Sequence, residues 1–206
     1  QRRFDDVRQL ADSLIFDIHD SIRDLPGAAP SRRLLIHTAL HYLDGLSREA
    51  RGDPGLARDL AAAYLRLGDL QGQALSANEG DYSGALYSYR RALTLWQARL
   101  SAQPADIAAR LDLAMTLGKL SDLTWTLGDP AAALGYSQQT VIQSRLLSAS
   151  HPGDRRYLIL RAVSVLDYGY KLFRIRGDRT ESLLLVRRAT QRLQSLAAAD
   201  PQDLLT

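Results

Sequence analysis

The sequence predicts an all-α protein of about four antiparallel helical hairpins, and three observations lead to this prediction. Proline recurs with a spacing of 48 to 50 residues, at Pro54, Pro104, Pro152 and Pro201. The dipeptide Gly-Asp recurs with nearly the same period, at 80–81, 128–129 and 177–178. Between these marks apolar residues follow steps of three and four, and no sustained two-residue alternation indicates a strand. Two independent marks with one period indicate an internal repeat.

Each Gly-Asp pair is expected to join the two helices of a hairpin. Glycine adopts the left-handed conformation that ends a helix, and the aspartate can accept hydrogen bonds from the free N–H groups of the next helix. Pro130, directly after Asp129, fits the first helical position, where the missing N–H costs nothing. Each repeat is therefore predicted as helix, tight turn, helix and a proline-marked turn.

The apolar positions then define the elements in order along the chain. The N-terminal pair of helices is lined by Phe4, Val7, Leu10, Leu14, Ile18 and Ile22, then by Leu35, Ala39, Leu43 and Leu46. Helices of the repeats show the same spacing at Ala85, Leu86, Tyr89, Ala92, Leu93 and Trp96, and at Leu113, Ala114, Leu117, Leu120, Leu123 and Leu127. The turn at 25–30 lacks Gly-Asp, and Ser31 is predicted to cap the helix that follows it.

The period also predicts how the domain is divided. We expect a single domain over residues 1–206, a length that suits one domain or two small ones. Its parts are a degenerate N-terminal hairpin at 1–53 and repeats at 54–103, 104–151 and 152–200. The chain begins at Gln1, so we expect it to be part of a longer protein.

Composition excludes several classes of protein. No cysteine is present, which removes disulfides, thiolate zinc sites and cysteine nucleophiles. No stretch approaches the ~20 apolar residues that span a bilayer. The 24 arginines and two lysines stand against 20 aspartates and three glutamates, and residues 145–192 carry a net charge of +7. The positive charge is therefore concentrated in the last third of the chain.

A family pattern lies within the hairpins. Its first unit comprises Tyr64, Leu67, Gly68, Gly80, Asp81, Tyr82, Ala85, Tyr89, Ala92 and Leu93. The later units comprise Leu117, Leu120, Leu123, Gly128, Asp129, Ala133, Leu134, Thr140 and Val141, then Leu166, Phe173, Gly177, Asp178, Leu183, Val186 and Ala189. This pattern resembles the tetratricopeptide repeat (TPR), which implies a right-handed superhelix. The period of about 49 residues exceeds the family's 34, so lengthened helices are expected.

A narrower resemblance rests on the segments 11–22, 25–27 and 60–72. They are similar to the C-terminal tetratricopeptide region of bacterial serine/threonine protein kinases of the acidobacterial type. The resemblance implies that the chain is the non-catalytic sensor or scaffold region of such a kinase. It further implies a parent protein anchored in the inner membrane, and it leaves open whether this region lies on the periplasmic side.

The chain itself lacks the motifs of an enzyme. It contains no kinase motif, no phosphate-binding loop and no nucleophile elbow. We therefore expect no catalytic residue, no cofactor and no enzymatic activity in these residues. His37 and His41 are four residues apart on a predicted helix and could face one metal ion, but a third ligand is missing. We expect two surface histidines and no metal site.

The remaining candidate site is a surface. The resemblance implies that the first helix of each hairpin lines a concave groove, whose candidate contact residues are Leu65, Asp69, Gln73, Met115, Asp122, Trp125, Asp167, Lys171 and Arg174. Met115, Asp122 and Trp125 share one helical face, and a tryptophan beside a carboxylate is typical of an interface hot spot. The competing interpretation places Trp125 in the core.

The resulting prediction is a module that binds a protein or peptide, and two alternatives stay open. The first is self-association into a homodimer through an exposed C-terminal end face. The second is binding of an anionic ligand or nucleic acid through the arginines of 145–192. Nucleic-acid binders interleave aromatic residues for stacking, whereas Tyr168, Tyr170 and Phe173 fit the core pattern. We therefore expect no nucleic-acid partner, and no insertion of this chain into a membrane.

Overall fold

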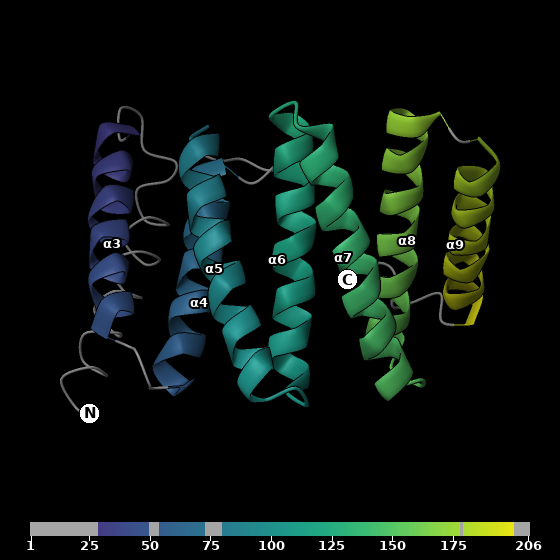
Figure 1. Ribbon diagram of the computed structural model, residues 1–206, viewed down its shortest axis with the longest axis horizontal. Helices are drawn as coiled ribbons and strands as arrows, with labels where there is room; N and C mark the ends of the chain where they lie inside the picture. Colours follow the sequence, from purple (N-terminus) through teal and green to yellow (C-terminus); the bar gives the residue numbers. More distant parts are fainter. Residues whose placement is uncertain (1–28, 50–53, 73–79, 178, 200–206) are drawn as a thin grey trace. The chain divides into compact units, whose positions relative to one another are not determined.

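The computed structural model describes residues 29–49, 54–72, 80–177 and 179–199. Within these ranges the chain forms helices and turns and no β-strand, which confirms the all-α prediction. The helices are α3 (Ala29–Glu49), α4 (Pro54–Gly72), α5 (Tyr82–Ala102), α6 (Ile107–Thr126), α7 (Pro130–Ser150), α8 (Arg155–Arg176) and α9 (Arg179–Ala199), shown in Figure 1. The helix predicted at residues 4–22 lies outside the described residues.

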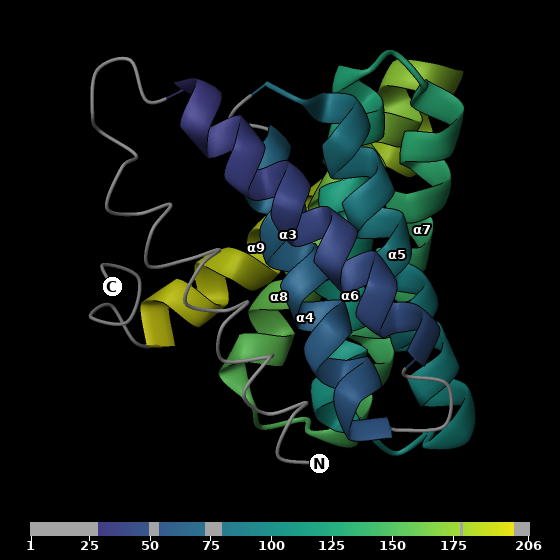
Figure 2. The ribbon, with the colours of Figure 1, turned by 90° about the vertical axis from the view of Figure 1, so that its left-hand side faces the viewer.

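The contacts between residues divide the chain into two compact units, which meet in sequence at Pro104. In unit 1, α4 packs on both α3 and α5, and the view in Figure 2 shows α3 lying over α4. In unit 2, α7 packs on α6 and α8, and α9 packs on α8. Each of the ranges 54–103, 104–151 and 152–200 holds two helices, as a helical repeat requires.

The Gly-Asp pairs have the predicted left-handed glycine, but only Gly128 and Gly177 lie within two residues of the end of a helix, because α4 ends at Gly72, eight residues before Gly80. The left-handed φ is shared by Gly80, Gly128 and Gly177, at 75°, 78° and 66°. Asp81 and Asp129 are the N-cap residues of α5 and α7, where their carboxylates accept hydrogen bonds from backbone N–H groups three residues later. The third aspartate, Asp178, lies outside the described residues. One predicted cap is wrong: α3 begins at Ala29, so Ser31 lies inside its first turn.

Unit 1 has a core of aromatic and small residues. Tyr64, Tyr89 and Trp96 are all buried, on α4 and α5. The two helices approach closely at Gly68, where a Cβ atom would lie 2.5 Å from Cε1 of Tyr89. The ring of Tyr89 is fixed there because its hydroxyl donates a 2.7 Å hydrogen bond to Asp69 Oδ1. Glycine at position 68 is therefore a packing requirement of this hairpin.

Unit 2 is built around leucines. Leu117, Leu120 and Leu123 on α6 are almost fully buried. Ala114 of the same helix forms a cluster with Leu147 of α7 and Tyr157 of α8. None of the helices in the described ranges combines the length and apolar character needed to cross a membrane.

Candidate functional site

The candidate site in unit 2 is organised by a buried lysine. Lys171 on α8 is only 2% exposed, and its Nζ donates to both carboxylate oxygens of Asp167, at 2.7 and 2.8 Å. The same Nζ donates to Asp122 Oδ1 at 2.9 Å and to Ser121 Oγ at 2.8 Å, both on α6. Four oxygen atoms from two helices thus surround one ammonium group, which joins α8 to α6.

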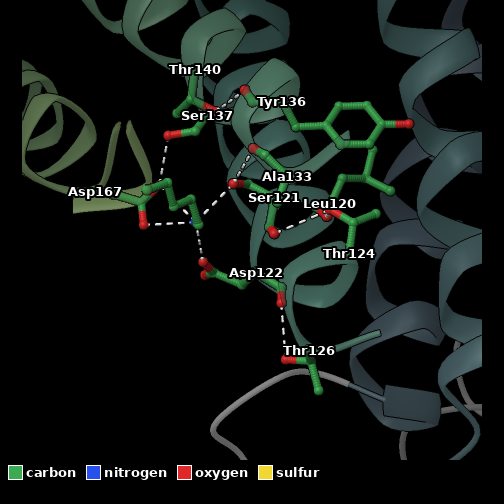
Figure 3. A network of polar contacts seen from close by, with 11 residues as sticks. Leu120, Ser121, Asp122, Thr124, Thr126, Ala133, Tyr136, Ser137, Thr140 and Asp167 are labelled. Atoms are coloured by element: carbon green, nitrogen blue, oxygen red, sulfur yellow. Dashed lines mark hydrogen bonds and ion pairs between the residues drawn. The ribbon is translucent and has the colours of Figure 1, made fainter. Parts of the chain in front are cut away.

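Two serines extend this network to α7 (Figure 3). Ser121 Oγ donates to the backbone carbonyl of Ala133 at 2.8 Å, and Ser137 Oγ donates to Asp167 Oδ2 at 2.7 Å. Two of the oxygens that accept from Lys171, Ser121 Oγ and Asp167 Oδ2, are therefore also hydrogen-bonded to α7. A buried charge is costly unless it is paired and its other donors are satisfied, and this network meets both conditions. We call Lys171, Asp167, Asp122, Ser121 and Ser137 the lysine network.

The two carboxylates of the lysine network reach the surface. Asp122 is exposed and Asp167 is half-buried, whereas the ammonium group between them is inaccessible. One cation and two carboxylates leave the network with a formal charge of −1. The atoms of the lysine network that face water are therefore carboxylate oxygens.

An aromatic pair lies about one helical turn after the two carboxylates of the network, one ring on each helix. Trp125 follows Asp122 by three residues on α6, and Tyr170 follows Asp167 by three residues on α8. Their ring centroids are 6.1 Å apart and the planes are tilted by 57°. Tyr170 is 51% exposed and Trp125 is half-buried, so both rings contribute to the surface. The network holds the two helices that carry the pair.

Met115 and Arg174 complete a surface that we call the α6–α8 face. Met115 is 44% exposed on α6, seven residues before Asp122, and Arg174 is exposed on α8, four residues after Tyr170. Residues three, four and seven apart lie on one side of a helix. The α6–α8 face therefore comprises Met115, Asp122 and Trp125 of α6 with Asp167, Tyr170 and Arg174 of α8.

The structure brings several of the sequence-predicted residues together. Asp122, Asp167 and Lys171 meet in one network, with Trp125 beside it. Lys171 differs from its expected role, because its ammonium group is buried among oxygen atoms and is not presented to a partner. Trp125 is half-buried, so its position matches neither the prediction of an exposed groove residue nor the prediction of a core residue in full.

The unit 1 candidates are placed differently. Leu65 and Asp69 are both half-buried on α4, and Asp69 accepts the hydroxyl hydrogen of Tyr89 within the hairpin. Gln73 lies outside the described residues. Asp69 therefore joins α4 to α5 within the hairpin.

One member of the α6–α8 face was missed by the sequence argument. Tyr170 was expected in the core with Phe173, but both are exposed, Phe173 at 41%. The signal was available in the spacing, because Tyr170 lies three residues after Asp167 and four before Arg174, on the face that those residues define.

Unit 1 has its own polar cluster, centred on Asp44 of α3. Asp44 accepts hydrogen bonds from the hydroxyl groups of Tyr64 at 2.6 Å and Tyr87 at 3.1 Å, and Arg91 Nε lies 3.8 Å away. Burial, followed by the hydrogen bond to Asp44, raises the pKa of the Tyr64 hydroxyl above its ordinary value. The cluster joins α3 to α4 and α5, because the hydroxyl groups of both tyrosines donate hydrogen bonds to the carboxylate of Asp44.

Metal ligands do not gather in the described part of the chain. His37 and His41 are both exposed on α3, and no group of three potential ligands in the described residues could hold a metal ion. Neither a protein-family model nor a curated protein matches the sequence.

Proposed function

We propose that the chain is a non-catalytic module that binds a protein or peptide through the α6–α8 face. The observation that carries this proposal is the Trp125–Tyr170 pair, two large aromatic side chains that meet at a partly exposed position. Aromatic residues dominate interface hot spots because they bury a large apolar area with few rotatable bonds. Met115 extends the apolar area, and thioether side chains adapt to differently shaped partners.

The lysine network supports the proposal by keeping the face in one arrangement. Binding is weakened by the entropy that is lost when a flexible surface becomes ordered. Here the aromatic pair is carried by α6 and α8, which are joined by two charge-assisted hydrogen bonds from Lys171 to Ser121 and Asp122, while two more from Lys171 to Asp167 lie within α8. The carboxylates of Asp122 and Asp167 lie beside the pair and offer acceptors for a partner's N–H groups.

The resemblances seen in the sequence extend the proposal to the parent protein. We take the chain as a TPR-like module with lengthened repeats, and as the sensor or scaffold region of a membrane-anchored serine/threonine kinase. In that setting, occupancy of the α6–α8 face would bias the association or orientation of the kinase domain. The Gly-Asp junctions and the close approach of Gly68 to Tyr89 are features that such a repeat would share.

The test is a selection of peptides from a random display library on the 206-residue chain. Selected peptides are then titrated by fluorescence polarisation against the wild type and against Trp125→Ala and Tyr170→Ala. Each substitution should raise the Kd by at least about tenfold, as expected for a hot spot. Ile142→Ala on α7 is the matched control, because Ile142 is an exposed apolar residue outside the face.

Two results would contradict the proposal. One is the failure of any peptide to be enriched over a blank surface. The other is enrichment of peptides that bind Trp125→Ala and Tyr170→Ala as tightly as the wild type. Circular dichroism of each variant separates a loss of binding from a loss of fold.

A further inference from the structure

A second surface of unit 2 lies on α9, away from the α6–α8 face. This helix contacts α8 through a narrow stripe, in which Ser182, Ala189 and Leu196 are buried at intervals of seven residues. At the closest approach, Cγ2 of Val186 and the Cβ of Leu185 would lie 3.1 and 3.2 Å from a Cβ added to Gly169 of α8. The opposite side of α9 is thus left facing water in the described part of the chain.

That opposite side combines aliphatic and basic residues. Leu183 is 55% exposed and Leu184 is 48% exposed, which is unusual for two consecutive leucines. Arg187 lies four residues after Leu183 and three after Leu184, and Arg188 lies four after Leu184. Because residues three and four apart are neighbours on a helix surface, these four side chains form one patch. We call it the α9 outer face.

The arginines of this region have no acidic partners in the described residues. Six exposed arginines of α8 and α9 form no ion pair with another described residue: Arg174, Arg176, Arg179, Arg187, Arg188 and Arg192. Other cations of the same hairpin are neutralised: Arg156 pairs with Asp154, and Lys171 pairs with two carboxylates. Glu181, in the first turn of α9 and three residues before Leu184, is exposed and is the one acidic residue of α9. The six arginines outnumber it, so the end of α8 and the length of α9 carry a net positive charge, which attracts anions.

We propose that the α9 outer face docks on a membrane surface that contains anionic lipids. Guanidinium groups bind lipid phosphates through paired N–H donors, and basic residues near such a surface each add to the attraction. Leu183 and Leu184 would enter the boundary between headgroups and acyl chains, as apolar residues of interfacial helices do. Docking at the interface requires no membrane-spanning helix.

The leucines favour a lipid surface over nucleic acid as the occupant. Proteins that bind single-stranded nucleic acid supply aromatic rings on which bases stack. The α9 outer face supplies two aliphatic side chains and no aromatic ring. Aliphatic side chains contribute to binding where acyl chains are within reach, and the arginines surround them at helical spacing.

The experiment is co-sedimentation of the 206-residue chain with vesicles of phosphatidylcholine, with and without about 30 mol% phosphatidylglycerol. We expect binding to the anionic vesicles alone, and weaker binding at about 0.5 M salt than at about 0.1 M, because salt screens the attraction. Arg187→Gln with Arg188→Gln should lower the partition coefficient by at least about tenfold. Leu183→Ser with Leu184→Ser should lower it as well, while the charge is unchanged.

The matched control is Arg145→Gln with Leu146→Ser on α7. It removes one exposed arginine and one exposed leucine that lie outside the α9 outer face, and binding should persist. Trp125→Ala should also bind vesicles normally, so this test is independent of peptide binding. If the serine variant unfolds by circular dichroism, Leu183→Ala with Leu184→Ala replaces it.

Three outcomes would overturn the proposal. The first is equal binding to both kinds of vesicle. The second is an equal loss of binding in the α7 control. The third is a normal partition coefficient of the leucine variant together with displacement of the chain from vesicles by a single-stranded oligonucleotide, which would assign the arginines to nucleic acid.

Discussion

At the scale of single residues, the position of Lys171 decides how the α6–α8 face is held. Its ammonium group is buried, whereas the two carboxylates that neutralise it reach water. Substitution of the lysine and substitution of the two carboxylates should therefore change the free energy of unfolding by different amounts. A buried cation without partners is costly, but a carboxylate near the surface can be hydrated when its partner is removed.

This asymmetry gives a prediction about three variants. Asp122→Asn with Asp167→Asn leaves Lys171 buried and unpaired, and should lower the free energy of unfolding by about 3 kcal/mol or more. Lys171→Met alone should cost less, about 1–2 kcal/mol, because the freed carboxylates become hydrated. Adding Lys171→Met to the double variant should recover part of its loss. Urea denaturation of the four proteins measures all three values, and a triple variant less stable than the double variant would contradict this account.

Gly68 provides a second prediction at this scale. A Cβ atom at this position would meet the ring of Tyr89, which is buried and fixed by its bond to Asp69. Gly68→Ala should therefore lower the free energy of unfolding by about 1–3 kcal/mol, the range for overpacked sites.

Gly45→Ala on α3 is the control, because nothing lies within 4 Å of the added atom. Alanine is the better helix former, so this substitution should raise the free energy of unfolding by up to about 1 kcal/mol. Thermal denaturation followed by circular dichroism checks the pair. If Gly68→Ala and Gly45→Ala changed the stability equally, the contact with Tyr89 would not be what requires glycine at position 68.

At the scale of helices, each turn in unit 2 sets where the next helix begins. Asp129 caps α7 through a 3.0 Å hydrogen bond from the backbone N–H of Ala132, and Gly128 before it adopts a left-handed φ. The two groups of α7 that bond to the network, the backbone carbonyl of Ala133 and the hydroxyl of Ser137, lie in the turns that follow. Accurate capping thus positions Ala133 and Ser137.

The cap gives a prediction at this scale. Asp129→Ala should lower the free energy of unfolding by about 1 kcal/mol, within the usual range for a lost N-cap. Asp129→Asn keeps an acceptor oxygen at the same position and should cost much less. Chemical denaturation of the two variants compares them, and an equal loss would mean that the charge and not the hydrogen bond stabilises α7.

The sequence predicts these turns well because their chemistry is local. Glycine for a left-handed φ and aspartate for a cap need no information from distant residues, so Gly128 and Asp129 were located in advance. Two further caps, Asp106 of α6 and Asp154 of α8, were missed although each follows a proline by two residues. The Pro-x-Asp spacing was the available signal.

The candidate site is predicted less completely because it depends on pairing between helices. Helical spacing places Asp122 and Trp125 on one face, but it cannot show that Lys171 is buried between two carboxylates. That outcome depends on how closely α8 approaches α6. For the same reason Tyr170 was assigned to the core, since its apolar ring fits a buried and an exposed position equally well in sequence.

At the scale of the whole molecule, the two surfaces of unit 2 differ in chemistry and therefore suit different kinds of partner. The α6–α8 face combines aromatic rings, a thioether and carboxylates, which suits a polypeptide. The α9 outer face combines leucines with arginines that form no ion pair among the described residues, which suits an anionic membrane surface. Recognition at both would come from exposed side chains on packed helices, and neither requires a catalytic group.

The central claim is that Trp125 belongs to a binding surface, and its fluorescence tests this most directly. Trp96, the other tryptophan, is 1% exposed, so Trp96→Phe leaves Trp125 as the single reporter. The account predicts that iodide quenches Trp125 in the free protein, and that a peptide selected on the chain blocks this quenching and shifts the emission to shorter wavelength. Unchanged quenching at saturating peptide would contradict the account, because the peptide would then bind elsewhere.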